Sequence, residues 1–246
     1  MNRAIIYKAL YVLVHWAFTI FEQVSGTLDY VTNKIVGFCH EFLFISERNS
    51  YLPKRITRIR KIPAHLTVIL GSEQPSYKDL ANLVIWCLAT RINFISFYDH
   101  KGLLKKNEDE LQYEISKRKL KEDHVIWHKG SESTYKNGFI GRKVHVKIVS
   151  EEDGKDSVVN LTKKLSQTKN INFNIEDISE QLQKQYEFPE PDLGFVCGKT
   201  FSLYNYPPWQ IRVTEFLSIG SHRDITFSFF LNMLDQYGKC EQRWGK

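Results

Sequence analysis

The chain has 246 residues and a formal net charge of +6, with 42% hydrophobic, 13% aromatic and 25% charged residues. This length suits one compact domain of about 150–200 residues with an appendage, and the composition excludes a disordered or many-pass membrane protein. The excess positive charge lies in one short run without acidic residues: Arg48, Lys54, Arg55, Arg58, Arg60 and Lys61. A nucleic-acid-binding domain would carry a basic face throughout. A basic run beside an apolar segment instead favours an anionic membrane surface as partner.

The first segment, Ala4–Phe21, is apolar or aromatic apart from three residues. These are Lys8, His15 and Thr19. A helix needs about 20 mostly apolar residues to cross a bilayer, so we expect this segment to span the membrane or insert deeply. One alternative is an amphipathic helix that lies in the interface. The other is a cleaved signal peptide, for which Ser25-Gly26 is only a weak cleavage site.

A second apolar stretch, Ile35–Ile45, is too short and interrupted to span alone, so it is expected to lie at the interface. The basic run follows it, which by the positive-inside tendency places the rest of the chain on the cytosolic side. We therefore divide the chain into a membrane-anchoring segment at 1–47, a basic juxtamembrane linker at 48–61 and a main domain at 62–246.

The main domain alternates between strand and helix signals. Short apolar or alternating runs predict strands at 65–70, 94–98, 144–149, 191–196 and 211–217. Helical spacing of apolar residues predicts helices at 77–88, 156–166, 175–186 and 226–239, and the charged stretch 107–123 is expected to form a solvated helix. Strands separated by helices indicate an α/β domain with a mainly parallel central sheet flanked by helices.

The general enzyme motifs are absent: no Walker-type loop, H-E-x-x-H pair, G-x-S-x-G elbow or G-x-G-x-x-G turn occurs. The four cysteines form no C-x-x-C pair and have no histidine at metal-ligand spacing, so neither a zinc site nor a disulfide framework is predicted. They are Cys39, Cys87, Cys197 and Cys240.

Several polar residues are better explained by structural roles than by catalysis. His65 begins a buried strand and is expected to be a hydrogen-bonded core histidine, and Asp192 is expected to cap a strand end. Asp99 and His100 are adjacent, so on a strand they point to opposite faces and form no acid–base dyad. A group of aromatic residues is assigned to core and dimer interface rather than to base stacking. It comprises Tyr204, Tyr206, Trp209 and Phe216.

Three segments carry a resemblance to a known family. They are Pro63–Gly71 (PAHLTVILG), Phe97–Gly102 (FYDHKG) and Pro191–Gln210 (PDLGFVCGKTFSLYNYPPWQ). The chain resembles the cis-prenyltransferase (undecaprenyl diphosphate synthase-like) family, and within it the Nogo-B receptor type of non-catalytic subunit of dehydrodolichyl diphosphate synthase. The resemblance implies a cis-prenyltransferase-like fold over residues 62–246.

The chemical residues of catalytic members are missing from these segments. Gly71 stands where the family has the aspartate that binds Mg²⁺, and Pro75 where it has a phosphate-binding arginine. Val196 and Ser202 replace two arginines that bind isopentenyl diphosphate. Thr200 and Tyr204 replace a glutamate and a serine. A departing diphosphate needs its charge neutralised, so the resemblance implies a pseudo-enzyme that is inactive alone.

The carboxyl terminus ends in an Arg-x-Gly motif, within Cys240–Lys246. The resemblance implies that this tail reaches the partner's active site, where Arg243 supplies charge to isopentenyl diphosphate and the Gly245 backbone N–H approaches a phosphate. Mg²⁺ is expected to be bound mainly by the partner. No side chain of this chain is expected to be a metal ligand, and the Gly245 backbone is the one group expected near the ion. The implied interface residues are Trp209, Glu215 and Phe216.

The resemblance implies an accessory subunit of a transferase complex at the endoplasmic reticulum membrane, with its main domain cytosolic. The complex would extend farnesyl diphosphate with isopentenyl diphosphate to the polyprenyl diphosphate precursor of dolichol, for protein glycosylation. The partners are thus a catalytic subunit, isopentenyl diphosphate in that subunit's site and membrane lipid, without nucleic acid. One alternative is a membrane receptor or scaffold that uses the fold only for protein binding. An autonomous homodimeric prenyltransferase conflicts with Gly71 and Pro75.

Overall fold

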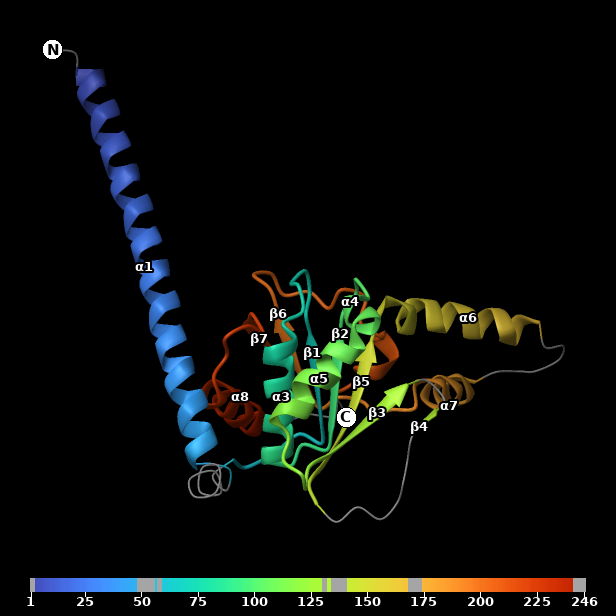
Figure 1. The fold of residues 1–246 in the computed structure, drawn as a ribbon. Helices are drawn as coiled ribbons and strands as arrows, with labels where there is room; N and C mark the ends of the chain where they lie inside the picture. Colours follow the sequence, from blue (N-terminus) through green and yellow to red (C-terminus); the bar gives the residue numbers. More distant parts are fainter. Residues whose placement is uncertain are drawn as a thin grey trace. The chain divides into compact units, whose positions relative to one another are not determined.

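A computed structural model describes residues 3–47, 56, 59–129, 132–133, 141–167 and 174–240. The chain divides into two compact units, Met1–Arg48 and Asn49–Lys246. Figure 1 shows the fold of each unit along the sequence.

The first unit is one continuous helix, α1, at Arg3–Glu47. The helix continues through residues 22–34, between the two apolar stretches, because they contain no proline and only one glycine, Gly26. Large side chains on α1 are exposed, among them Trp16 at 66% and Phe21 at 70%. The sequence predicted that residues 4–21 span the membrane or insert deeply into it. Among the described residues, no helix is long and apolar enough to cross a membrane.

The second unit is built on a seven-stranded sheet in the order β4-β3-β5-β2-β1-β6-β7. All neighbouring strands are parallel except β3 and β4, which confirms the mainly parallel α/β prediction. The strands are β1 (His65–Ile69), β2 (Phe94–Tyr98), β3 (His124–Lys129), β4 (Glu132–Ser133), β5 (Lys143–Val149), β6 (Leu193–Cys197) and β7 (Glu215–Gly220).

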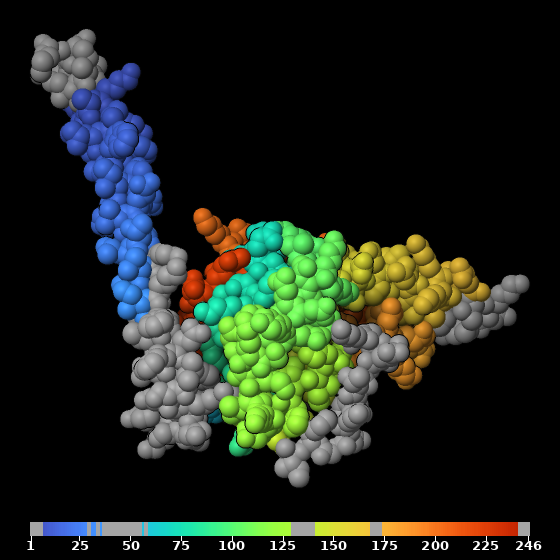
Figure 2. Space-filling model, viewed as in Figure 1, coloured from blue at the N-terminus to red at the C-terminus, as the bar shows by residue number. Residues whose placement is uncertain are grey.

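Helices cover both faces of this sheet. They are α3 (Tyr77–Thr90), α4 (Leu103–Lys106), α5 (Glu108–Arg118), α6 (Lys155–Ser166), α7 (Ile175–Tyr186) and α8 (Phe227–Lys239), with short 3-10 turns η1 (Glu151–Asp153) and η2 (Pro208–Gln210). On one face, Trp86 of α3 contacts Phe230 of α8, which in turn meets Phe195 of β6. Figure 2 shows α6 and α7 as a lobe at one end of this unit.

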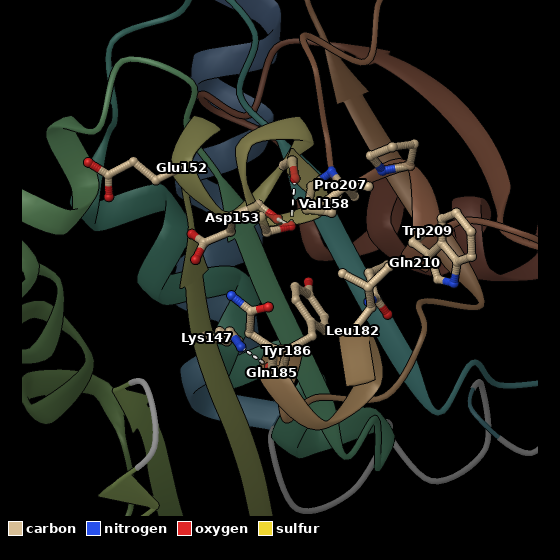
Figure 3. A pocket seen from close by; sticks show the side chains of 13 residues that line it. Lys147, Glu152, Asp153, Val158, Leu182, Gln185, Tyr186, Pro207, Trp209 and Gln210 are labelled. Atoms are coloured by element: carbon tan, nitrogen blue, oxygen red, sulfur yellow. Dashed lines mark hydrogen bonds between the residues drawn. The ribbon is translucent and has the colours of Figure 1, made fainter. Parts of the chain in front are cut away.

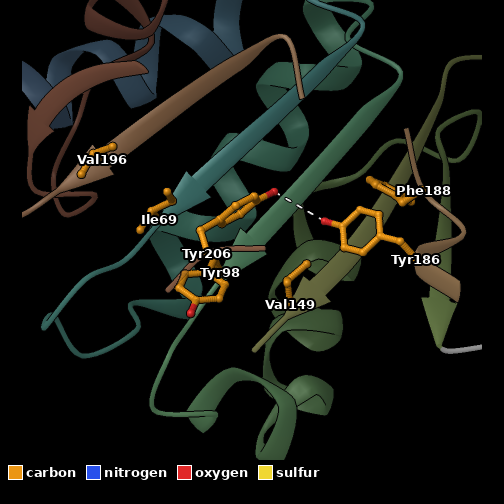
Figure 4. Close-up of a cluster of buried hydrophobic side chains, with 7 residues drawn as sticks. All are labelled: Ile69, Tyr98, Val149, Tyr186, Phe188, Val196 and Tyr206. Atoms are coloured by element: carbon orange, nitrogen blue, oxygen red, sulfur yellow. Dashed lines mark hydrogen bonds between the residues drawn. The ribbon is translucent and has the colours of Figure 1, made fainter. Parts of the chain in front are cut away.

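Successive strand residues point to opposite faces of the sheet, so the Val196 side chain lies on the other face from that of its neighbour Phe195. Val196 belongs to a buried cluster on the α7 face that also holds Tyr98 from β2 and Tyr186 from α7. Figure 4 shows the Tyr186 and Tyr206 hydroxyls directed at each other, 3.5 Å apart. Burial raises the pKa of Tyr186 well above its usual value. This cluster packs the α7 face beside the carboxyl ends of β1, β2 and β6.

Two strand predictions need correction. The strand expected at 211–217 begins only at Glu215, because the preceding residues form a tethered turn in which the Thr214 hydroxyl donates to the Pro191 carbonyl at 2.7 Å. Strand β3 was not predicted, although it contains the strong strand formers Val125, Ile126 and Trp127. The charged stretch before it was expected to be helical up to residue 123, whereas α5 ends at Arg118.

Candidate functional site

A crevice is expected where the order of the sheet reverses. From β1 the chain continues to β2 on one side, whereas from β6 it continues to β7 on the other side. In open α/β sheets, ligands bind outside the carboxyl ends of the strands at such a switch point. The ends of β1 and β6 therefore define the candidate site, with Gly71 two positions after β1 and Gly198 directly after β6.

The ring of Tyr204, which is partly buried, packs against Gly71 at this switch point. A Cβ atom placed on Gly71 would lie 2.8 Å from Tyr204 Cε2 and 2.9 Å from the Cys197 carbonyl oxygen, and Gly71 has a φ of +60°. The Tyr98 hydroxyl donates to the Tyr204 carbonyl at 2.5 Å, and the His100 ring stacks on the Tyr204 ring with centroids 5.0 Å apart. A side chain at position 71 would therefore be strained, and an aromatic ring occupies the space beside it.

Cationic side chains around the crevice bind the loop that follows β1. Lys101 Nζ donates to the Ser72 carbonyl at 2.6 Å, and Arg223 Nη2 donates to the Gln74 carbonyl at 2.8 Å. Both cations therefore satisfy carbonyl groups of this chain. In a diphosphate site, cations of this kind would face phosphate oxygens.

His222 and Glu73 fasten the same loop to the segment before α8. The His222 Nδ1–H donates to Glu73 Oε2 at 2.6 Å, and His222 Nε2 accepts from the Ser76 backbone N–H at 2.9 Å. Only the neutral ring protonated at Nδ1 satisfies both bonds. Burial lowers the pKa of His222, which favours this neutral form. We call Glu73, Ser76 and His222 the loop clasp.

The loop clasp lies beside Cys197, and the ligand atoms of Glu73, Cys197 and His222 lie within 4.8 Å of one another. A sulfur, a nitrogen and a carboxylate oxygen are ligand types that zinc accepts. A metal on Nδ1 would however move the ring proton to Nε2, which faces the Ser76 N–H donor. Burial also raises the pKa of the Cys197 thiol. The geometry fits a hydrogen-bonded clasp better than a metal site.

The crevice also does not fit Mg²⁺. Gly71 offers no carboxylate at the end of β1. The carboxylate of Asp99, at the end of β2, is buried, and its two oxygens accept from the backbone N–H groups of Lys101 at 2.9 Å and Leu104 at 3.0 Å. Magnesium needs free oxygen ligands in octahedral geometry. No step of a reaction is therefore assigned to a metal in this crevice.

The structural roles predicted for His65 and Asp192 are confirmed. His65 Nδ1 lies 2.7 Å from the Pro189 carbonyl oxygen and Nε2 lies 2.8 Å from Ser96 Oγ, and burial lowers the His65 pKa to about 3. Asp192 Oδ2 accepts from the backbone N–H groups of Ala64 at 2.7 Å and His65 at 3.0 Å. Asp192 thus binds backbone groups at the start of β1, which is a structural role.

The predicted site residues fall into three places. Glu215 and Phe216 lie together on β7, the edge strand of the sheet. Trp209 lies on η2, where its indole N–H donates to Ser179 Oγ of α7 at 3.1 Å. Arg243 and Gly245 lie outside the residues that the structure describes.

Sequence analysis missed the loop clasp and the packing of Tyr204 against Gly71. Glu73 and His222 are 149 positions apart, and Tyr204 and Gly71 are also far apart in the chain, so no local pattern could indicate either contact. The one available signal was the resemblance, which implies a serine at the position of Tyr204.

No protein-family model matches the chain. It is 34% identical over 206 residues to the mouse dehydrodolichyl diphosphate synthase complex subunit Nus1, covering 78% of this chain and 68% of the relative. With the human NUS1 subunit it shares 31% identity over 201 residues, covering 76% of this chain and 68% of the relative. The crystal structure of a probable undecaprenyl diphosphate synthase from Campylobacter jejuni matches at a TM-score of 0.50 and 17% identity, covering 76% of this chain and 100% of that chain. At that identity the match shows the fold alone.

Proposed function

Because the chain belongs to the family of NUS1 subunits of dehydrodolichyl diphosphate synthase complexes, we propose that it is the non-catalytic member of such a complex. It pairs with a catalytic subunit and raises the rate at which that subunit elongates its product. The complex extends farnesyl diphosphate with isopentenyl diphosphate to the polyprenyl diphosphate precursor of dolichol, for protein glycosylation. The chain alone has no transferase activity.

The packing of Tyr204 against Gly71 is the observation that carries this proposal. A catalytic crevice must leave room for a diphosphate and its counter-charges at the end of β1. Here the Tyr204 ring packs against Gly71 in that place, and Lys101 is bound to the Ser72 carbonyl of the loop. The fold supports the proposal that the chain is a subunit of the complex. The occupied crevice supports the proposal that catalysis takes place in the partner chain.

The carboxyl-terminal tail completes the partner's site in this proposal. Arg243 supplies positive charge to isopentenyl diphosphate there, and the Gly245 backbone N–H contacts a phosphate oxygen or lies near the ion. Mg²⁺ belongs to the partner, since this chain's crevice lacks a carboxylate at Gly71.

The edge strand β7 is the surface that we assign to the partner subunit. It ends the sheet, and Glu215, Phe216 and Leu217 are only partly buried. An edge strand leaves backbone groups unpaired, which another chain can pair or cover. Trp209 is the third residue of the proposed interface, on η2.

Helix α1 binds a membrane surface in this proposal, at the endoplasmic reticulum with the main domain in the cytosol. Its exposed apolar side chains, such as Trp16 and Phe21, supply the apolar contact. The long product is insoluble in water, so synthesis beside a bilayer lets the growing chain enter lipid.

Co-purification tests whether the complex forms. The tagged full-length chain is co-expressed with a catalytic dehydrodolichyl diphosphate synthase subunit, and the eluate is analysed by size-exclusion chromatography. We expect the two chains to elute together in a fixed ratio, and Phe216→Glu to reduce the recovered partner. Failure to retain any partner would instead favour a receptor or scaffold that uses the fold for other protein contacts.

A further inference from the structure

Helix α1 leaves a row of apolar side chains uncovered. In α7, by comparison, the side chains of Leu182 and Tyr186, drawn in Figure 3, are buried against the main domain. On α1, the side chains of Val24, Leu28 and Val31 are each at least 50% exposed. A continuous apolar stripe on a protein surface marks an interaction site, so α1 has an unpartnered face.

The apolar residues of α1 follow a strict seven-residue repeat. When the positions of each heptad are lettered a to g, positions a and d are apolar at every step from Tyr7 to Ile45. Position a holds Tyr7, Val14, Phe21, Leu28, Ile35 and Phe42, and position d holds Leu10, Ala17, Val24, Val31, Phe38 and Ile45. An apolar a and d pattern that continues over more than three or four heptads is typical of a coiled coil.

The stripe is narrow where the rest of the helix is polar. Within residues 22–34, the a and d positions hold Val24, Leu28 and Val31, whereas the neighbouring e and g positions hold serine, threonine or lysine. A seam limited to a and d fits a partner helix, because contact with lipid uses a broader apolar face. This stretch also lies beyond Trp16, which we assigned to the membrane contact.

The period of the stripe also distinguishes a partner helix from a flat surface. A straight α-helix has 3.6 residues per turn, so a seven-residue repeat drifts around it by about 20° per heptad. Over the five heptads from Tyr7 to Phe42 the drift reaches about 100°. The stripe therefore turns away from a flat membrane surface along the helix, whereas two helices that supercoil keep it in contact throughout.

The helix with a matching repeat is α1 of another copy of this chain. Among the described helices, α1 has 45 residues, and the next in length, α3, has 14 and packs within the main domain. In a parallel pair, position g of one helix meets position e of the next heptad in the other. Leu13 then lies beside Phe18 of the other copy, and Thr27 beside Thr32, so apolar groups meet apolar groups and hydroxyl groups meet hydroxyl groups.

We propose that α1 forms a parallel coiled coil with α1 of another copy of this chain. Leu28 at position a, between valines at d, favours assemblies of more than two strands, so further copies can join the same seam. This assembly goes beyond the proposed subunit function. Its test uses the full-length chain without the catalytic partner, so a failure of that complex to form has no influence on the result.

Disulfide cross-linking locates the seam. The full-length chain in detergent micelles carries Val31→Cys at a d position, with Cys39→Ser and Cys240→Ser, which leaves only the two cysteines that are buried in the main domain. The control is Gly26→Cys at the outward f position, where nothing lies within 4 Å of an added Cβ atom. A disulfide needs Cα atoms less than about 7 Å apart, so we expect cross-linking at position 31 to be at least about tenfold faster than at position 26.

A charge in the seam tests the strength of the association. Val31→Glu places a carboxylate at position d, and the matched control Val12→Glu makes the same change at position f, at a valine that is equally exposed. We expect sedimentation equilibrium to show an at least about tenfold higher Kd of self-association for Val31→Glu, because a buried unpaired charge is costly. Val12→Glu is expected to leave the Kd unchanged.

Circular dichroism shows whether both glutamate variants keep their helix content. A monomeric parent chain would overturn the proposal, as would self-association that a helical Val31→Glu variant leaves unchanged. Equal cross-linking at positions 26 and 31 would overturn it as well. Each of these results would mean that lipid or a different protein covers the stripe.

Discussion

The ring of Tyr204 lies where a side chain on Gly71 would begin, with Cε2 2.8 Å from the position of its Cβ atom. The two residues therefore depend on each other: the glycine leaves room for the ring, and a side chain at position 71 would collide with the ring. This contact occupies the switch point of the sheet, where an α/β protein would otherwise bind a ligand. The partly buried Tyr204 thereby packs against the buried cluster that holds Tyr98 and Val196.

A substitution at Gly71 tests this contact. A non-glycine residue at positive φ costs about 1–2 kcal/mol by itself, and Gly71→Ala or Gly71→Asp additionally drives Cβ into Tyr204. The matched control is Gly102→Ala, because Gly102 has a φ of +68° and nothing within 4 Å of its added Cβ. We expect chemical denaturation to show a larger loss of unfolding free energy for Gly71→Ala than for Gly102→Ala. Equal losses would mean that the crevice has room beside Gly71.

The loop clasp contributes to stability through Glu73. Glu73→Ala leaves the His222 Nδ1–H without its acceptor, and a lost hydrogen bond to a charged group costs about 1.5–3 kcal/mol of unfolding free energy. Glu152→Ala serves as control because the Glu152 side chain is 86% exposed, and we expect it to stay within about 0.5 kcal/mol of the parent. Urea unfolding measures both. A neutral effect of Glu73→Ala would contradict the clasp.

Stability is expected to fall in mild acid because buried histidines are neutral in the folded chain. Burial is the main cause that lowers the pKa from 6.5 to about 3 for His65 and to about 4 for His145. The folded state then binds fewer protons than the unfolded state, so this stability is complete above pH 6.5 and is lost as pH falls toward 4. We expect His145→Gln to show a shallower decline in unfolding free energy between these pH values. An identical slope would exclude His145 from the effect.

Arg243 is predicted to act in the partner's site. Arg243→Ala removes one charge-assisted phosphate contact of about 1.5–3 kcal/mol, which corresponds to a turnover of the complex about tenfold or more lower. Lys239→Ala, which removes an exposed cation near the end of α8, is the control and is expected to leave turnover unchanged. Both variants are assayed as co-purified complexes. Unchanged turnover of an intact Arg243→Ala complex would remove Arg243 from the site.

Membrane binding by α1 is predicted to depend on its apolar side chains. Phe21→Glu removes an apolar contact of about 1.5–3 kcal/mol, so binding to anionic vesicles should weaken about tenfold or more. Gln23→Glu adds the same charge at an exposed position of α1 without loss of apolar surface. Vesicle flotation compares the two variants. Equal flotation would show that the contact is purely electrostatic.

Much of the main domain was predictable because its elements are locally encoded. Helix α7 has the predicted bounds, Ile175–Tyr186, and its start carries a capping box in which Asn174 accepts from the Asp177 N–H. The buried parallel strand β1, at His65–Ile69, was likewise predictable because its run of residues is almost wholly apolar.

What could not be predicted depends on contacts between distant residues. The start of β7 is set by the Thr214 hydroxyl bond to Pro191, and the loop clasp pairs Glu73 with His222. The glycine at position 71 and the proline at position 75 were visible in the sequence, whereas the contact of Gly71 with the Tyr204 ring was not.

Polyprenyl synthesis by the purified chain alone tests the central claim most directly. The chain, a catalytic partner and their co-purified complex are each given farnesyl diphosphate, labelled isopentenyl diphosphate and Mg²⁺, and the labelled lipid product is measured. We predict no product from the chain alone and much faster synthesis by the complex than by the partner alone. Product formed by the chain alone would contradict the account, because it would require a working site in the crevice where Tyr204 packs against Gly71.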